Sequence, residues 1–384
     1  MSTFLEEVEV SCFKREIGTI KKDKSKPLVI FIGGIHGNEP MGVFALHRVL
    51  DEIEKNNIEI DGTLIALTGN LEALKKHERF LKCDLNRIWN KKNLDRLADY
   101  QELDVENKEM AAIWDILKEA INGHQSDRIC IFDLHTTSSD SVPFITINDT
   151  LSNRRIAREI PVVTIFGIEE FLSGPLLSYI NELGYNALGF EGGQHDSNES
   201  YLNHQAFVWL AMSVKGLISK DHPKVVEGKK RLNDVSGEPG KFFEITYRRN
   251  IKNGDKFKME PGFTNFQPIR EGDFLAVHNG EKLYSKWNTR MFMPLYQKQG
   301  DDGYFIVRPI SKFVLWISKY MRHYELERLL LFLPGVDMVD GKRHIIKVNR
   351  KIAWFKAREL FHLLGYRQKI YEGSTITFIR REKQ

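Results

Sequence analysis

The segment PLVIFIGGIHGNEPMGVFALHRVLDEI, residues 27–53, decides the fold of this chain. Its first eight residues are almost all apolar or glycine, which is typical of a strand buried on both faces. Val43, Leu46, Leu50 and Ile53 then recur with helical spacing, so we expect a helix with one apolar side. A buried strand that runs directly into a helix is the repeating unit of an α/β protein.

The alternation of strands and helices continues through the first half of the chain. Apolar runs at residues 63–67, 129–134, 162–166 and 186–190 predict further buried strands, and the pattern at residues 201–218 predicts a helix. This order predicts an α/β fold whose mainly parallel or mixed sheet carries helices on both faces. In such a sheet, ligands bind beyond the carboxyl ends of the strands.

The character of the sequence changes after about residue 221. Between residues 240 and 309, glycine-containing turn dipeptides separate short apolar runs, which predicts a smaller antiparallel β domain. The tail predicts helices at residues 313–333 and 353–364, with strands at 344–348 and 375–379. We therefore expect three parts: a catalytic domain at residues 1–225, a β-rich domain at 235–310 that shapes the cleft, and a C-terminal α/β extension at 311–384.

Composition favours a soluble protein of the cytoplasm. Hydrophobic residues make up 42% of the chain and charged residues 28%, and the longest apolar runs are too short to span a bilayer. Cys12, Cys83 and Cys130 are odd in number and widely spaced, which argues against a disulfide framework. The first ten residues contain three Glu and no basic residue, unlike a secretory signal.

Positive charge is concentrated in the tail. Residues 311–384 contain 16 Lys and Arg against 7 Asp and Glu, an excess of +9 in a chain whose total is +4, so the preceding residues sum to −5. A basic tail can bind nucleic acid or an acidic partner, but it more often forms a solvated surface. We favour the solvated surface.

The sharpest chemical signal is GGIHGNEP, residues 33–40, where the first strand ends and the helix begins. Pro40 suits the first turn of a helix, because a backbone donor there would be unpaired. His36 and Glu39 lie three residues apart across a glycine-containing turn, so both side chains can reach one point. Catalytic zinc sites use three such N and O ligands and keep one position open for water. By itself, this pattern also fits a helix-start carboxylate beside a surface histidine.

A third ligand is available at the end of another predicted strand. His135 ends the apolar run IFDLHT, residues 131–136, at the same edge of the sheet as His36. Asp133 lies two residues earlier, on the same side of the strand, and can hold the second nitrogen of His135. We therefore expect His36, Glu39 and His135 to bind one metal ion per chain. Zn²⁺ is preferred, and other divalent ions fit the same donors.

Two further segments supply polar groups to the same edge. Glu191 follows an apolar strand and precedes two glycines, where it can move a proton to and from reacting water; a capping or salt-bridged Glu is equally compatible. Arg79, Asn86 and Arg87 offer donors for a substrate carboxylate or a developing oxyanion, and Asp84 can orient one of them. Surface ion pairing is the simpler account of any single Arg.

Four motifs together resemble the aspartoacylase / succinylglutamate desuccinylase family, which is related to the zinc carboxypeptidases. They are G-x-H-G-N-E at residues 34–39, C-D-L-N-R at 83–87, F-D-L-H-T at 132–136 and F-E-G-G at 190–193. Their order matches the family, and the resemblance covers roughly residues 27–310. The tail has no counterpart.

The resemblance implies a role for each motif residue. His36, Glu39 and His135 would be the zinc ligands, and Glu191 the general base and then the general acid. Arg79 would polarise the scissile carbonyl. Asn86 and Arg87 would hold a substrate carboxylate.

The chain departs from the family at two places. Aspartoacylases have Asn directly after the third ligand, where this chain has Thr136, so a substrate contact is in doubt. Their second domain also supplies a pocket tyrosine, for which Tyr296 and Tyr304 are candidates. Both departures put N-acetylaspartate and succinylglutamate in doubt as substrates.

Several residues are assigned no chemical role. His195 and Asp196 follow Glu191, where they can line the cleft, but a loop histidine is more often solvated and we favour that interpretation. Trp209, Trp316 and Trp354 occur in apolar helical contexts, which predicts places in the core.

Three functions are compatible with these features. The first is a zinc-dependent deacylase that cleaves the amide bond of an N-acyl amino acid or a similar small acylated carboxylate. The second is a carboxypeptidase-like peptidase acting on a peptide or cell-wall fragment. The third is a binder of nucleic acid or an acidic partner through the basic tail, ranked last because it leaves the metal-binding pattern unexplained. We expect no membrane partner, and a homo-oligomer stays open.

Overall fold

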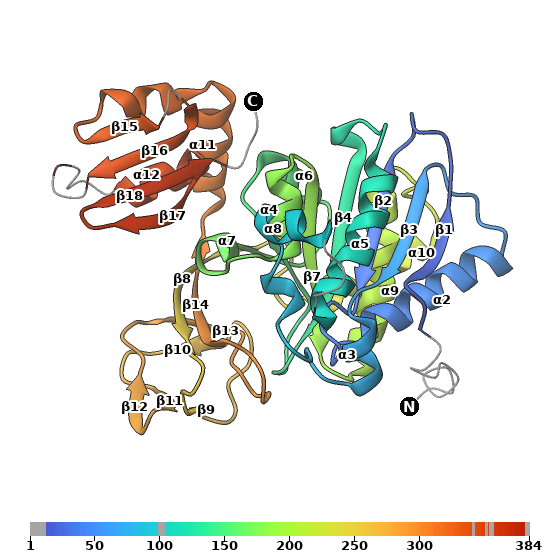
Figure 1. The fold of residues 1–384 in the computed structure, drawn as a ribbon, viewed down its shortest axis with the longest axis horizontal. Helices are drawn as coiled ribbons and strands as arrows, with labels where there is room; N and C mark the ends of the chain where they lie inside the picture. Colours follow the sequence, from blue (N-terminus) through green and yellow to red (C-terminus); the bar gives the residue numbers. More distant parts are fainter. Residues whose placement is uncertain (1–12, 99–103, 340–341, 350–351, 353–356, 381–384) are drawn as a thin grey trace.

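The computed structural model describes residues 13–98, 104–339, 342–349, 352 and 357–380. Its largest element is a mixed sheet in the strand order β1-β3-β2-β4-β7-β5-β6-β8-β14-β13-β10 (Figure 1). The strands are β1 (Glu16–Ile20), β2 (Leu28–Gly33), β3 (Thr63–Thr68), β4 (Ile129–Thr137), β5 (Phe144–Ile147), β6 (Val163–Phe166), β7 (Asn186–Gln194), β8 (Phe242–Asn250), β10 (Pro268–Ile269), β13 (Thr289–Phe292) and β14 (Asp302–Ile310). The α/β fold expected from the sequence is confirmed.

Strand β2 lies in the part of this sheet where neighbouring strands are parallel. It pairs in parallel with β3 on one side and with β4 on the other, and β4 pairs in parallel with β7. All six residues of β2 are buried. Val29 and Phe31 contribute to the core on one face, whereas Leu28, Ile30 and Ile32 contribute to the core on the other. This two-sided burial explains the unbroken apolar run.

Helices cover both faces of the sheet, as expected. Helices α2 (Met41–Lys55), α6 (Leu151–Arg158), α9 (Asn198–Val214) and α10 (Pro223–Val235) pack on one face. Helices α5 (Val105–Ile121) and α8 (Leu176–Glu182) pack on the other. The shorter elements are α3 (Leu71–Lys76), η2 (Leu85–Arg87), α4 (Lys91–Asp95), η3 (Arg96–Ala98), η5 (Ser126–Arg128) and α7 (Ile168–Phe171). None of the described helices has the length and apolar content needed to cross a bilayer.

The β-rich region extends the central sheet. Strand β8 pairs in parallel with β6 and antiparallel with β14, so the sheet continues past residue 235 into β13 and β10. A separate antiparallel sheet contains β9 (Phe257–Met259), β11 (Phe274–His278) and β12 (Glu281–Tyr284). Strands from residues 1–225 and from residues 235–310 therefore belong to the same sheet. The division of these residues into two domains stays a prediction.

The tail forms a third sheet in the order β15-β16-β18-β17 (Figure 1, orange and red). Its elements are α11 (Lys312–His323), η6 (Leu326–Phe332), β15 (Val336–Val339), β16 (Lys342–Asn349), α12 (Ala357–Leu363), β17 (Tyr366–Glu372) and β18 (Thr375–Arg380). The expected strands at 344–348 and 375–379 are confirmed. The helix expected at 313–333 is divided, because Glu325 has a left-handed backbone (φ 50°) that no α-helix accommodates. Residues 353–356 of the other expected helix lie outside the described residues.

A buried ionic network joins the tail to helix α6 of the α/β region. Asp149, which is fully buried, accepts hydrogen bonds from Arg154 of α6, Arg322 of α11 and Arg367 of β17. These three guanidinium groups hold the pKa of Asp149 well below its usual value, although burial alone would raise it. Part of the tail's positive charge is therefore internal.

Of the tryptophans expected in the core, Trp209 of α9 is buried. Trp316 of α11 is 53% exposed, so that prediction is wrong. Its ring instead contacts Phe313 and Tyr320 along the outer side of the helix. The apolar spacing belongs to an exposed aromatic row, which periodicity cannot distinguish from a core face. Trp354 lies outside the described residues.

Candidate active site

The loop between β2 and α2 is shaped by glycines that let it pack tightly. Gly34 has a positive φ of 71°, a conformation that favours glycine. A Cβ on Gly37 would lie 2.1 Å from the carbonyl carbon of Ala73, so no side chain fits there. The loop therefore brings His36 and Glu39 back over the end of the sheet.

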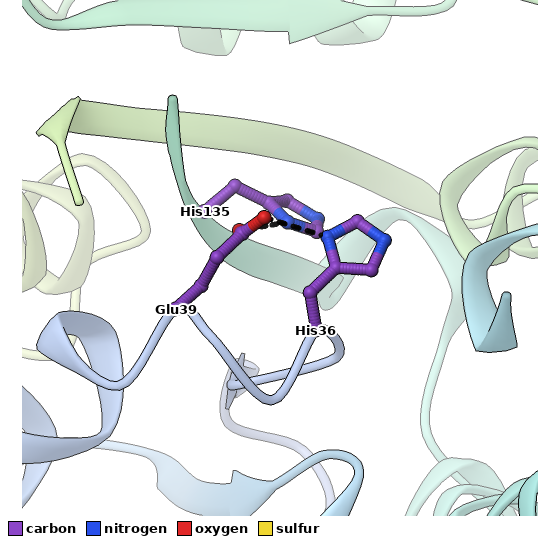
Figure 2. Close-up of side chains that lie close together, drawn as sticks. All are labelled: His36, Glu39 and His135. Carbon is purple, nitrogen blue, oxygen red and sulfur yellow. Dashed lines mark hydrogen bonds and ion pairs between the residues drawn. The ribbon is translucent and has the colours of Figure 1, made fainter. Parts of the chain in front are cut away.

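The structure brings together the three expected metal ligands. His135 lies near the carboxyl end of β4, and Figure 2 shows its ring facing Glu39 and His36. The Nδ1 atoms of His36 and His135 lie 2.8 Å and 3.0 Å from the two carboxylate oxygens of Glu39. One ligand atom from each of the three residues lies within 4.8 Å of the others. All three side chains are buried, and the group could hold a metal ion.

Each imidazole has a second carboxylate on its far side. Asp84 Oδ1 lies 3.1 Å from His36 Nε2, and Asp133 Oδ2 lies 2.7 Å from His135 Nε2. Both Nδ1 atoms thus face Glu39, while both Nε2 atoms face an aspartate. Carboxylates behind ligand histidines fix the ring orientation and increase the basicity of the ring. The contact expected between Asp133 and His135 is present.

The histidines and the carboxylates of this group stabilise each other's charged forms. Burial alone would raise the pKa of Glu39, but His36 and His135 lower it well below its usual value. Burial would lower the pKa of His135, but Asp133 and Glu39 raise it well above its usual value. The backbone N–H of Thr136 also donates to Glu39 Oε2 at 3.0 Å. Glu39 is therefore held as an anion.

Glu191 lies beside this group on strand β7. The parallel register pairs it with His135, and its side chain lines the same pocket. Burial raises the pKa of Glu191 to about 8, an effect that His135 opposes and Glu39 reinforces. Its Oε2 is buried without a hydrogen-bond partner among the described residues. A carboxyl group whose pKa lies near neutrality, aimed into a pocket, is suited to proton transfer.

A buried histidine packs behind Glu191. A Cβ on Gly192 would lie 2.2 Å from Cε1 of His204, so only glycine allows this contact. The Nδ1 of His204 donates to the carbonyl of Ser200 at 2.8 Å, and burial lowers the pKa of His204 to about 4. The glycine after Glu191 therefore has a packing function.

Arg79 and Asp84 lie together, as expected. The Nε and NH2 groups of Arg79 donate to Asp84 Oδ2 at 3.2 Å and 3.0 Å, and its NH1 lies 3.4 Å from Glu39 Oε1. Burial alone would lower the pKa of Arg79, but Asp84 and Glu39 raise it. Asp84 thus connects Arg79 to His36.

Asn86 and Arg87 line the pocket, but both have partners within the protein. Asn86 Oδ1 accepts from the backbone N–H of Leu176 at 2.9 Å. The NH2 group of Arg87 donates to Asp302 of β14 at 2.9 Å, and its NH1 donates to the carbonyl of Asn86 at 3.0 Å. Asp302 comes from the β-rich region, and no motif pointed to it.

Sequence reasoning missed a polar network at one side of the pocket. Of the two positions considered for His195, we favoured the solvated one, but His195 lines the pocket and its Nδ1 lies 2.6 Å from Thr136 Oγ1. Its Nε2 lies 3.1 Å from Gln297 Oε1, which also accepts from Asn38 at 2.9 Å. The Asn of G-x-H-G-N-E was the one available signal for this network. Gln297, 259 residues further on, gave none.

Neither candidate tyrosine lines this pocket. The hydroxyl of Tyr296 donates to the carbonyl of Glu260 at 2.7 Å and accepts from the N–H of Phe263, so it points into the β-rich region. Tyr304 is buried in an apolar cluster of that region. The part of the chain that the structure describes supplies no other tyrosine to the pocket lining.

A second group, Cys83, Asp104 and Glu106, has potential ligand atoms close together. The Glu106 carboxylate, however, accepts from the backbone N–H groups of Leu81, Lys82 and Cys83. Asp104 accepts from the N–H of Asn107 at the start of α5. These contacts give the group a structural function in holding the C-D-L-N-R segment.

Fold and pocket together define the class of protein: an α/β protein with a candidate metal centre at the carboxyl edge of its sheet. Residues 25–194 match the model of the succinylglutamate desuccinylase/aspartoacylase catalytic domain. The succinylglutamate desuccinylase of Pseudomonas fluorescens is 30% identical over 273 residues, which cover 69% of this chain and 78% of that protein. The one from Ectopseudomonas mendocina is 24% identical over 279 residues, with the same coverages of 69% and 78%.

Solved structures share the fold. Succinylglutamate desuccinylase from Vibrio parahaemolyticus matches with a TM-score of 0.58 and 15% identity, covering 77% of this chain and 86% of that one. An ectoine utilization protein from Ruegeria pomeroyi matches with a TM-score of 0.53 and 16% identity, covering 76% and 88%. The chain belongs to the succinylglutamate desuccinylase/aspartoacylase family and is a deacylase of that type.

Proposed function

We propose that this protein is a zinc-dependent deacylase that hydrolyses the amide bond of an N-acyl amino acid or a similar small acylated carboxylate. The observation that carries the proposal is the convergence of His36, Glu39 and His135 on one point beside Glu191. Family membership supports the reaction type, and the donor set supports the metal.

The residues fit a zinc ion. Two imidazole nitrogens and one carboxylate are the ligands of several catalytic zinc sites. The outer nitrogens of both rings are already held by Asp84 and Asp133, which leaves the Nδ1 atoms for a cation. When bound, the ion would lower the pKa of water and polarise a carbonyl oxygen. The other donors needed for the reaction come from the chain itself.

Glu191 would move the proton. As a carboxylate lining the pocket, it takes a proton from the attacking water. The same carboxyl group then gives this proton to the departing nitrogen, so the amine leaves neutral. Burial keeps the pKa of Glu191 well above that of an exposed Glu, which favours the return of the proton.

Arg79, Asn86 and Arg87 would position the substrate. Arg79 is held against Asp84 and lines the pocket, where it can donate to the oxygen of the scissile carbonyl as negative charge develops. Asn86 and Arg87 line the same pocket, where their amide and guanidinium groups can bind one substrate carboxylate.

The β-rich region supports a small substrate over a peptide. One side of the pocket consists of residues from the segment 293–305, including Gln297 and Asp302. A cleft narrowed in this way favours a small acylated carboxylate over an extended chain. The buried pairing of Arg322 and Arg367 with Asp149 also weakens the case for a nucleic-acid-binding tail.

We also propose that residues 1–225, 235–310 and 311–384 are the folding units of a cytoplasmic enzyme. Cys83 and Cys130 are free thiols, which suits a reducing compartment. The third cysteine, Cys12, lies outside the described residues.

The test is a hydrolysis screen of N-acyl amino acids with zinc-loaded protein and with protein treated with a chelator. We expect activity in the loaded protein alone. Glu191→Gln should reduce kcat by about 10²–10⁴-fold while the zinc content stays at one per chain. Glu227→Gln, which changes an exposed Glu of α10, is the matched control and should keep full activity. Near-normal turnover of Glu191→Gln would disprove the assigned proton transfer.

A further inference from the structure

The pocket beside the candidate metal site has one apolar side. The volume of the cavity is about 110 Å³. The apolar wall is formed by Ile168, Leu172, Pro175, Leu177, Met293 and Phe305. Its residues come from α7, the segment leading into α8, α8 itself and the β-rich region. None of these side chains can pair with a charge, so the wall suits a hydrocarbon group.

Both arginines of the pocket are already paired with carboxylates. Arg79 contacts Asp84 and Glu39, as described above. Arg87 forms a salt bridge with Asp302 at 2.9 Å. The described pocket lining includes no Lys and no other Arg. Protein cations in the pocket are thus neutralised before any substrate binds.

Asp302 is the residue that neutralises Arg87. It lies at the start of β14, and its other carboxylate oxygen accepts from Nε of Arg248 on β8. The NH1 group of Arg248 in turn donates to the carbonyl of Phe171, at the end of α7. Asp302 is therefore held between two arginines, and each of them would lose this counter-charge if Asp302 moved away.

We propose that Asp302 and the apolar wall restrict this deacylase to acyl groups that carry no carboxylate. This inference rests on the proposed function and specifies its substrate class: an N-acyl amino acid with an uncharged aliphatic acyl chain. A carboxylate at the end of the acyl chain would meet the apolar wall, the Asp302 anion or uncharged polar side chains such as Asn148 and Ser178, and none of these supplies a counter-charge. Burial of an unpaired carboxylate is strongly unfavourable. The carboxylate of the amino acid keeps the two residues assigned to it above, Asn86 and Arg87, both of which line the pocket.

The wild-type enzyme tests this directly with a matched pair of substrates. N-pentanoyl and N-succinyl derivatives of the same amino acid have similar length and differ in the terminal carboxylate. We expect zinc-loaded protein to have a kcat/KM at least about tenfold higher for the pentanoyl compound. Equal or higher kcat/KM for the succinyl compound would overturn the inference and leave the proposed function standing. No zinc-dependent hydrolysis of any N-acyl amino acid would disprove the proposed function itself.

A variant pair assigns the preference to Asp302. In Asp302→Asn the shape is kept but Arg87 loses its counter-charge, so kcat/KM for the succinyl compound should rise about tenfold relative to the pentanoyl compound. Asp301→Asn changes the exposed neighbouring residue and should leave the ratio unchanged. An unchanged ratio in folded Asp302→Asn protein would show that Asp302 does not set the specificity.

A second variant covers the case in which Asp302→Asn does not fold. Leu172→Lys places a cation in the apolar wall, and it should also raise the kcat/KM ratio of succinyl to pentanoyl substrate. An unchanged ratio would show that the apolar wall does not determine the preference for uncharged acyl groups.

Discussion

Asp84 links the two charged groups of the site, because its Oδ1 lies 3.1 Å from His36 Nε2 while its Oδ2 accepts from Arg79. Removal of a carboxylate behind a ligand histidine typically lowers metal affinity 10–100-fold. We expect Asp84→Ala to weaken zinc binding by about that factor, measured by competition with a chelator of known affinity. Asp61→Ala, which removes a surface partner of Lys26, is the control. Unaltered zinc affinity in Asp84→Ala would contradict this assignment.

The stability of the metal-free protein should depend on pH through Glu191. Burial raises its folded-state pKa from 4.5 to about 8, so ionisation is disfavoured in the folded protein. The unfolded chain loses this proton first, and the free energy of unfolding should fall as pH rises from about 4.5 to 8. Metal-free Glu191→Gln should thus be more stable than wild type at pH 8 by about 1–4 kcal/mol.

This difference is measured by urea unfolding in the presence of a chelator. At pH 5 both proteins carry a neutral side chain at residue 191, and their stabilities should be similar. A stability difference that does not change between pH 5 and pH 8 would contradict the raised pKa of Glu191.

Gly192→Ala should destabilise the protein, because its Cβ would lie 2.2 Å from the ring of His204. Overpacking of this kind costs about 1–3 kcal/mol. Since the substituted residue directly follows Glu191, kcat should fall as well. A double-mutant cycle is the control: adding His204→Ala frees the space, so the loss caused by Gly192→Ala should be smaller in that background. Strictly additive losses would mean that the two residues do not clash.

Asp149→Ala should strongly reduce stability, because it leaves Arg154, Arg322 and Arg367 buried without their shared carboxylate. Breaking a buried ion pair from one side costs about 3–5 kcal/mol. Thermal or urea unfolding measures the loss. Glu325→Ala removes the exposed pair with Arg328 and should cost less than about 1 kcal/mol. Similar effects of both variants would show that burial does not strengthen the network.

Much of the fold was predictable because the decisive signals are local. Residues 27–53 alone specify a buried strand and the helix that follows, since two-sided burial requires an unbroken apolar run. The boundary of β6 differs from prediction by one residue, and α9 begins and ends a few residues early. The prediction failed for Trp316, because helical spacing of apolar residues fits both a buried face and an exposed aromatic row. The row that includes Trp316 faces outward.

The sequence by itself placed His36, Glu39, His135 and Glu191 at one edge, because the carboxyl ends of parallel strands must meet there. Only the tertiary structure decided what surrounds them. Asp302 reaches Arg87 across 215 residues, and Gln297 reaches Asn38 across 259. Such contacts depend on how β14 and the preceding loop pack against the sheet, and no periodicity or motif encodes that packing. The residues of the proposed hydrolysis could thus be predicted from the sequence. The proposed selectivity for the acyl group depends on ion pairs between residues far apart in the chain.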